Sequence, residues 1–390
     1  MIEKKTSSKE KSLKQIAIFN YSSNIGKAPS AISMVKILLE NHYNIDFFTD
    51  SYQVLPLPDF HSQNIVFHAN YKKNRFKILG SWGSRFIQYL HTAFIITKKI
   101  RYNCFIGVDQ NGLIIASILG LILRVQVIYF SFEIYFLKEA ANWKSRLKKR
   151  FEILFQKKVI ATVIQDKIRG ELLKNENRVF NKEMIFVPNS FITDSLEEID
   201  SKYLQKKFGI DNDKLIILFA GGIGEWTMSE ELVRVSYEWP DNWILIIHGE
   251  GQQAEVDKLR QLCDGSKVIL SDKMVPYSEL DSMVKSAKIG LALYKNSGQG
   301  IFEMGKASGK IWQYLRCGLP VITMDFPSLV DLIEVEDCGI CVNNEKEVKT
   351  AIEKIFADYE HYSNNAVKCY LNHGDFRKGF DGVLKLLKDI

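Results

Sequence analysis

The sequence predicts an α/β protein made of two doubly wound, Rossmann-like domains that face a cleft. Short buried strands alternate with amphipathic helices through both halves. The 390 residues also exceed the ~250–300 at which a single hydrophobic core stops growing. Residues 1–190 carry 29 Lys and Arg against 14 Asp and Glu, a net charge of +15, whereas residues 191–390 carry 23 against 32, a net charge of −9. We therefore expect domains over 1–190 and 191–374, with 375–390 forming a helix that crosses back to the first.

The first half begins with a β-α-β pattern. A strand over 15–21 precedes the polar loop of Gly26, a helix over 31–42 and a second strand over 44–50. The loop lacks G-x-G-x-x-G, which disfavours a dinucleotide site. A further strand over 125–132 ends just before Glu133, whose carboxylate either faces the interdomain cleft or is exposed and idle.

The first half is basic enough to attract polyanions. No Asp or Glu lies between Asp59 and Asp109. Aromatic residues are interleaved with these lysines and arginines, as in some nucleic-acid-binding proteins. However, Phe86, Leu90 and Phe94 recur at helical spacing and are typical of a core, so we expect no nucleic-acid partner.

Residues 142–159 predict a basic amphipathic helix. Trp143, Leu147, Phe151, Leu154 and Phe155 share one face, and residues 138–158 hold eight basic and two acidic residues. Such a helix either docks on anionic lipid or packs inward with a solvated outer face. On the first interpretation, membrane or acceptor contacts come from Lys144, Lys148, Lys149 and Arg150.

The most informative stretch runs from Ala287 to Met324. It reads as a buried strand, a Gly-containing loop, a short helix stopped by Gly318 and Pro320, and a second buried strand. With Ser308 as N-cap, Lys310 falls in the first helical turn, where the helix dipole disfavours a cation by roughly 0.3–1 kcal/mol. A bound phosphate would reverse that sign, although a solvated surface lysine is an equal alternative.

Composition favours a cytoplasmic protein. The N-terminus has no apolar run typical of a signal peptide, and the longest apolar run, 112–123, is shorter than the ~20 residues of a membrane span. Six cysteines suggest no disulfide framework. The basic helix extends the expectation to a peripheral position at the inner face of the plasma membrane.

In order along the chain, these segments resemble glycosyltransferase family 4, whose fold is termed GT-B. The segments include "VIYFSFE", "FVPNS", "FAGGIGEW", "ILIIHGEG" and "GKIWQYLRCGLPVIT". The last is similar to the family signature Lys-x-x-Glu-Tyr-Leu-x-x-Gly-x-Pro-Val, with Lys310, Tyr314, Gly318 and Pro320 in register. The resemblance covers nearly the whole chain.

The resemblance implies hexosyl transfer from a nucleotide diphosphate sugar, without cofactor or metal and with retained configuration. Lys310 and Glu133 are the candidate catalytic residues. The expected donor-binding residues are Gly26, Gly222, Met274, Val275, Pro276, Tyr294, Glu303, Ser308, Gly309, Lys310 and Gln313. The acceptor would be a glycan or lipid-linked intermediate in cell-surface polysaccharide or glycoconjugate synthesis.

Two departures from the family pattern affect this expectation. Gly305 and Gln313 stand where the family has paired glutamates, and the loop after Gly222 lacks the usual Arg and Lys. Glu303 is a substitute for the first carboxylate from a shifted loop. The alternative function is therefore a non-catalytic GT-B protein that binds a nucleotide sugar or glycan, or supports a partner enzyme.

Overall fold

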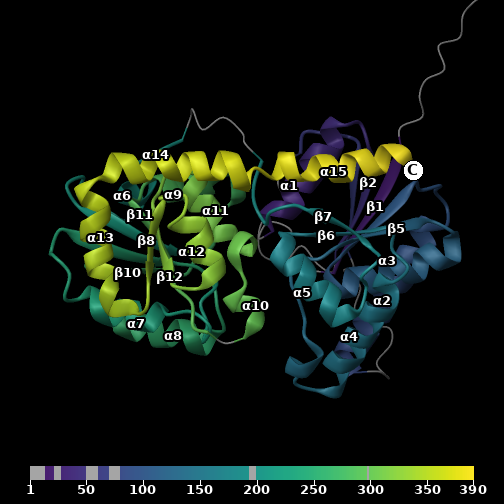
Figure 1. The fold of residues 1–390 in the computed structure, drawn as a ribbon, viewed down its shortest axis with the longest axis horizontal. Coiled ribbons are helices and arrows are strands. Elements are labelled where there is room, and N and C mark those ends of the chain that lie inside the picture. The colour runs from purple at the N-terminus through teal and green to yellow at the C-terminus, as the bar shows by residue number, and fades with distance from the viewer. Residues whose placement is uncertain (1–13, 22–27, 50–59, 70–79, 193–198, 297) are drawn as a thin grey trace, which may run out of the picture.

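The computed structural model describes residues 14–21, 28–49, 60–69, 80–192, 199–296 and 298–390, and shows two α/β domains side by side (Figure 1). Each domain has one parallel sheet with helices on both faces, which confirms the predicted fold class. Parallel strands require crossover connections, and the alternating helices of the sequence supply them. The predicted Gly26 contact lies outside the described residues.

The N-terminal sheet has seven strands in the order β3-β2-β1-β4-β5-β6-β7. The strands are β1 (Gln15–Asn20), β2 (Asn44–Thr49), β3 (Ile65–Ala69), β4 (Cys104–Val108), β5 (Gln126–Phe130), β6 (Ala161–Ile164) and β7 (Glu183–Phe186). The helices are α1 (Pro29–Glu40), α2 (Gly80–Thr97), α3 (Asp109–Leu123), α4 (Trp143–Gln156) and α5 (Lys167–Asn177). Two apolar clusters fill the two faces of this sheet.

The C-terminal sheet has six strands in the order β10-β9-β8-β11-β12-β13. They are β8 (Leu215–Ala220), β9 (Trp243–His248), β10 (Val268–Ser271), β11 (Ile289–Ala292), β12 (Val321–Met324) and β13 (Gly339–Val342). The helices are α6 (Tyr203–Phe208), α7 (Ser229–Ser236), α8 (Gln253–Leu262), α9 (Leu280–Lys285), α10 (Gln299–Phe302), α11 (Gly309–Arg316), α12 (Pro327–Ile333), α13 (Val348–Ala357) and α14 (Tyr359–Cys369).

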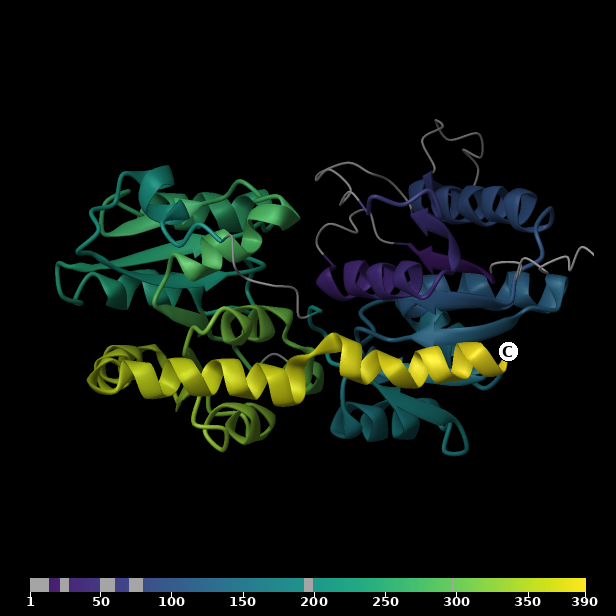
Figure 2. The ribbon, with the colours of Figure 1, turned by 90° about the horizontal axis from the view of Figure 1, so that it is seen from above.

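The last helix, α15 (Phe376–Asp389), packs on the N-terminal domain although α14 packs on the C-terminal one (Figure 2). Phe376, Phe380 and Val383 are buried against the N-terminal sheet. At the junction, the Tyr370 hydroxyl and the Phe376 N–H both donate to the Phe191 carbonyl oxygen, at 2.9 and 3.0 Å. The two connections between the domains therefore meet at one point.

Hydrogen bonds join the carboxyl edges of the two sheets. Asn189, which follows β7, donates its side-chain N–H to the Ala307 carbonyl oxygen at 2.9 Å and its backbone N–H to that of Lys306 at 3.1 Å. Both acceptors precede α11. Loops beyond the strands of both domains thus meet, and this is the place where α/β proteins bind ligands.

Candidate donor and acceptor site

Helix α11 begins where the sequence predicts, with Ser308 at the N-cap position and Lys310 in the first turn. The Ser308 side chain does not cap the helix, because its hydroxyl lies 2.9 Å from the Tyr294 hydroxyl. Tyr294 was expected to contact the donor, and the structure instead places it as a buried support for the start of α11. Gly309 faces the first domain, since a Cβ added to it would lie 3.5 Å from the Asn189 carbonyl oxygen.

Lys310 is partly exposed, and its side chain lies against two aromatic rings. Its Nζ lies 4.3 Å from the centroid of the Phe219 ring and 4.8 Å from that of Tyr294. No carboxylate of the described residues lies within ion-pair distance of it, and burial lowers the pKa of Lys310 to about 7. Aromatic faces attract a cation but do not neutralise it. An anionic ligand at the α11 N-terminus would supply the missing charge.

The glycine pair after β8 leaves room for this lysine. A Cβ added to Gly221 would lie 2.7 Å from Lys310 Cε, so Gly221, whose φ is +143°, is the glycine that adjoins Lys310. The predicted Gly222 instead faces Trp226, whose ring also covers Gly224. Trp226 therefore occupies the space beside the loop in which the family has basic residues. Gly221 was missed because sequence alone does not distinguish the members of a glycine pair.

Lys310 makes nucleotide affinity depend on pH. Since the charged form attracts phosphate and its pKa is about 7 in the free protein, binding must raise that pKa. We expect the affinity for a nucleoside diphosphate to fall by nearly tenfold per pH unit above about pH 7, until the pKa of the complex is reached. Calorimetry from pH 6 to 9 measures this effect. Lys310→Met should bind weakly with a flat profile, and an unchanged slope in that variant would contradict the assignment.

Gln313 is buried and its amide is already engaged. Its Nε2 donates to Asp281 Oδ1 at 2.5 Å, and Asp281 also pairs with Arg316. The sequence predicted Gln313 to replace a ribose-binding carboxylate. In the structure its Oε1 and the second N–H of its amide are left for a ligand, and Asp281, which the sequence analysis missed, is the carboxylate that holds the amide.

The Asp281 contact predicts the effect of restoring the family residue. Gln313→Glu would set two carboxylates at hydrogen-bond distance, because the amide donor to Asp281 is replaced by a second negative charge. We expect the free energy of unfolding to fall by ~1–3 kcal/mol. Urea unfolding measures this loss. Adding Asp281→Asn should recover most of it, and a fully stable single variant would show that the Gln313–Asp281 contact is not important.

The backbone conformation at position 305 explains why the chain has glycine there and not the glutamate of the family pattern. The φ of Gly305 is +24°, the residue is buried, and an added Cβ would lie 3.2 Å from the Ser328 carbonyl oxygen. A glutamate there would be strained. Glu303, two residues earlier, is partly exposed and follows α10, so it remains the substitute that the sequence suggested.

The other expected donor residues precede α9. Val275 has its side chain in the C-terminal core, so only its backbone remains for a ligand, whereas Met274 and Pro276 are partly exposed. This arrangement corrects the expectation for the Val275 side chain. Contact between this segment and the nucleotide base stays a prediction.

Arg169, a buried residue of α5 that the sequence analysis missed, joins the two domains. Its guanidinium donates to the Phe132 carbonyl oxygen at 3.3 Å and to that of Gly300 at 3.2 Å. It also approaches the Glu303 carbonyl oxygen at 3.5 Å. Arg169 therefore positions the segment that carries Glu303.

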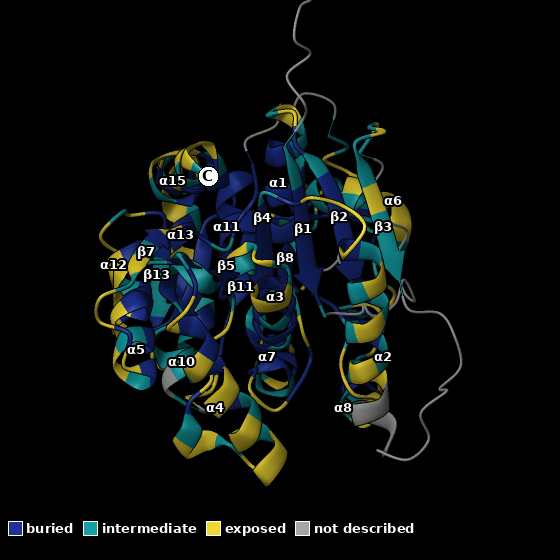
Figure 3. Cartoon of the chain, turned by 90° about the vertical axis from the view of Figure 1, so that its right-hand side faces the viewer, coloured by how far each residue is buried: buried dark blue, intermediate teal, exposed yellow. Residues whose placement is uncertain are grey.

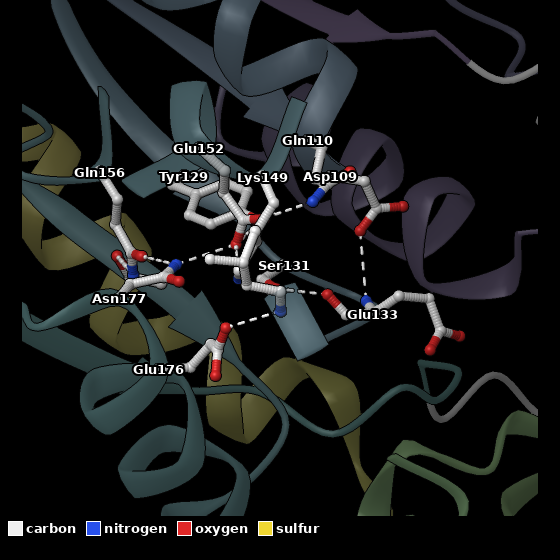
Figure 4. Close-up of polar contacts among 12 residues, drawn as sticks. Asp109, Gln110, Tyr129, Ser131, Glu133, Lys149, Glu152, Gln156, Glu176 and Asn177 are labelled. Atoms are coloured by element: carbon white, nitrogen blue, oxygen red, sulfur yellow. Dashed lines mark hydrogen bonds and ion pairs between the residues drawn. The ribbon is translucent and has the colours of Figure 1, made fainter. Parts of the chain in front are cut away.

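Glu133 is exposed and lies beside two charged groups at the edge of the N-terminal sheet. Its N–H and that of Phe132 donate to Asp109 Oδ1 at 3.2 and 2.9 Å (Figure 4). Desolvation by the surrounding protein raises the pKa of Glu133, and the positive charge of the Arg169 guanidinium opposes that increase. Desolvation, followed by repulsion from Glu133, raises the pKa of Asp109 to about 7. Glu133 and Lys310, the two candidate catalytic residues, do not contact each other in the described part of the chain.

Asp109 also lines a pocket of about 400 Å³ in the N-terminal domain. Its walls come from the start of α3, the segment after β5 and the first turns of α4. Asn111 Oδ1 is buried there without a hydrogen-bond partner among the described residues, and Lys148 also lines the pocket. Asp109 has φ +52°, a strained conformation of the kind found at functional sites. With Asp109, Glu139 and the Asn111 carbonyl oxygen in its lining, the pocket can accept hydrogen bonds from hydroxyl donors.

The four basic residues assigned to a membrane or acceptor separate into two groups. Lys144 and Arg150 are exposed on α4, whereas Lys148 faces the pocket. Lys149 is buried, with Nζ 3.1 Å from Glu152 Oε1. The prediction that Lys149 contacts a membrane surface is therefore wrong, because its charge is already paired inside the domain.

Together, the two facing α/β domains, each built on one parallel sheet, define a GT-B fold with a lysine at the start of α11. Residues 215–358 match the family model described as Glycosyl transferases group 1. This match supports the resemblance to a glycosyltransferase over most of the C-terminal domain, and the solved structures below share the GT-B fold.

Solved structures share this fold over nearly the whole chain. Anabaena HepE in complex with UDP and glucose has a TM-score of 0.70 at 13% identity, covering 97% of this chain and 100% of that one. Sucrose-phosphate synthase from Thermosynechococcus elongatus has a TM-score of 0.72 at 14% identity, covering 96% and 98%. WaaG, a glycosyltransferase involved in lipopolysaccharide biosynthesis, has a TM-score of 0.67 at 12% identity, covering 94% and 98%.

One curated relative matches part of the chain. It is the chitobiosyldiphosphodolichol beta-mannosyltransferase of Candida albicans, 26% identical over 124 residues. The match covers 30% of this chain and 25% of the relative. In the part of the chain that the structure describes, no helix is long and apolar enough to cross a membrane.

Proposed function

We propose that this protein is a hexosyltransferase that moves a sugar from a nucleotide diphosphate sugar to a glycan or lipid-linked acceptor. The observation that carries the proposal is Lys310, an uncompensated cation at the start of α11 on the edge where α/β domains bind ligands. The group 1 match over residues 215–358 and the UDP complexes of a protein of the same fold support a nucleotide sugar as donor.

In this account the site stabilises the departing diphosphate. Negative charge develops on the phosphate oxygens as the sugar is transferred, and a preorganised cation in a poorly solvated site stabilises that charge strongly. Lys310 supplies the cation, and the N–H groups of the first turn of α11 supply aligned dipoles. The chemistry is proposed to be metal-independent and retaining, as the family resemblance implies.

The acceptor is proposed to occupy the pocket beside Asp109. That pocket lies beyond the strands of the N-terminal sheet, and Arg169 links its neighbour Phe132 to the Glu303 segment of the donor domain. Cell-surface polysaccharide or glycoconjugate synthesis, in the cytoplasm at the inner face of the plasma membrane, is the proposed setting.

A panel of nucleotide sugars tested by thermal shift is the first experiment. A ligand that binds only the native state raises the unfolding temperature by mass action. At least one uridine or guanosine diphosphate sugar should do so, and the effect should be lost in Lys310→Ala. No shift across the panel would contradict the proposed donor site.

A second candidate function is a non-catalytic GT-B protein that binds a nucleotide sugar or glycan. Gln313 and Gly305 favour it, because both positions lack the carboxylate of the family pattern and Gln313 is held by Asp281. Binding without release of nucleoside diphosphate would distinguish this function from transfer.

A further inference from the structure

Helix α4 has its polar side inward. Its buried residues are Lys149, Glu152, Phe155 and Gln156, three of which are polar. Glu152 accepts hydrogen bonds from Lys149 Nζ at 3.1 Å, Gln110 Nε2 at 2.6 Å and Asn177 Nδ2 at 2.9 Å (Figure 4). This network, together with Phe155 in the apolar core, attaches the helix to the domain.

The apolar side of α4 faces outward. Trp143, Leu154, Leu147 and Phe151 are 68%, 49%, 42% and 40% exposed. At 100° per residue they fall on one face of the helix. In Figure 3, α4 projects from the domain and much of its ribbon has the colour of exposed residues. Exposure of large apolar side chains to water costs free energy, and the fold leaves these four partly exposed on one face. A contiguous apolar face of this kind indicates an external partner.

Positive charge flanks the apolar stripe. Lys144, Arg146, Arg150 and Lys157 are all exposed around it. The one acid of α4, Glu152, is buried on the opposite side, so the outer face of this helix carries no negative charge. Tryptophan and leucine beside lysine and arginine form the pattern of helices that lie in the interface of an anionic bilayer.

A second copy of the chain fits this face poorly. In a two-fold symmetric dimer each patch meets itself, and the four flanking cations of one copy would then face those of the other. Like charges oppose such a contact. Anionic lipid headgroups supply the opposite charge, and the acyl region takes the apolar stripe.

We propose that the outer face of α4, formed by Trp143, Leu147, Phe151 and Leu154 with Lys144, Arg146, Arg150 and Lys157, docks on the surface of an anionic lipid bilayer. The inner side of the same helix contributes Ser145 and Lys148 to the pocket beside Asp109. One helix would therefore have the bilayer on one side and the acceptor pocket on the other. The inferred presentation of a lipid-linked acceptor rests on the proposed function, whereas the docking surface does not.

Co-sedimentation of the full chain with phosphatidylcholine vesicles, with and without phosphatidylglycerol, tests the surface. We expect binding only to the anionic vesicles. Arg146→Gln with Arg150→Gln should lower the partition coefficient about 30-fold, since each basic residue near such a surface contributes ~1 kcal/mol. Trp143→Ser with Leu147→Ser should lower it by more than about tenfold. Val335→Ser, which changes a 72% exposed apolar residue of the other domain, is the matched control and should bind normally.

Two further measurements make the result decisive. Light scattering should show a monomeric native protein. A native dimer that the same substitutions dissociate would overturn the proposal. Equal binding of native and variant proteins to vesicles would overturn it as well. Calorimetry without vesicles should show unchanged nucleotide affinity in the α4 variants, because none of these residues lies in the donor site. Vesicle binding without nucleotide binding would leave the docking surface intact and contradict only the proposed function.

Discussion

Lys310→Ala is expected to weaken the binding of a nucleoside diphosphate by ~1.5–3 kcal/mol, the value of a charge-assisted contact, which is about a 10- to 150-fold rise in Kd. The loss follows from the position of Nζ above the Phe219 and Tyr294 rings, where no carboxylate of the described residues is close enough to pair with it. Isothermal titration calorimetry measures the change directly.

Lys295→Ala is the control for removal of a nearby lysine. Lys295 Nζ lies 2.6 Å from Glu231 Oε1, so its charge is already paired. We expect this variant to bind the nucleotide nearly as the native protein does. Equal affinities of the Lys310→Ala variant and the native protein would remove Lys310 from the site.

Glu152→Ala should lower the free energy of unfolding by ~3–5 kcal/mol, the range measured when one partner of a buried ion pair is removed. The substitution would leave the buried Lys149 ammonium without its counter-ion and would orphan the Gln110 amide. Glu152→Gln should cost less, since its carbonyl oxygen keeps part of the network.

Chemical denaturation monitored by circular dichroism tests the network beneath α4. Arg150→Ala is the control on the same helix, because Arg150 is exposed and its loss should change stability by less than ~0.5 kcal/mol. A Glu152→Ala protein as stable as the native one would show that the buried face of α4 does not hold the helix in place.

The architecture was predictable because strong local patterns agreed with the tertiary structure. The stretch 287–324 forms β11, α11 and β12, and α11 ends at Arg316, two residues before Gly318, whose φ of +74° suits glycine. Ser308 and Lys310 lie at the predicted helical positions. Hydrophobic periodicity and helix stop signals are enough to predict such elements, because packing on a parallel sheet requires the same periodic burial.

Side-chain partners distant in sequence were not predictable. The apolar stripe of α4 is visible in the sequence, yet its outward orientation depends on Gln110 and Asn177 of other helices, which satisfy Glu152. Arg169 contacts Gly300 across the domain interface, and no local pattern shows this. Asp109 did carry a signal, since it directly follows a buried strand at the edge where ligands bind.

The release of nucleoside diphosphate from the nucleotide sugar that binds best is the most direct test of glycosyl transfer. With native protein and a panel of lipid-linked glycan acceptors, we predict multiple turnovers, slowed at least tenfold in Lys310→Ala at saturating donor because the departing diphosphate loses its cation. Tight binding of the donor with no release above the protein-free rate, with or without acceptors, would contradict the account and support the non-catalytic alternative.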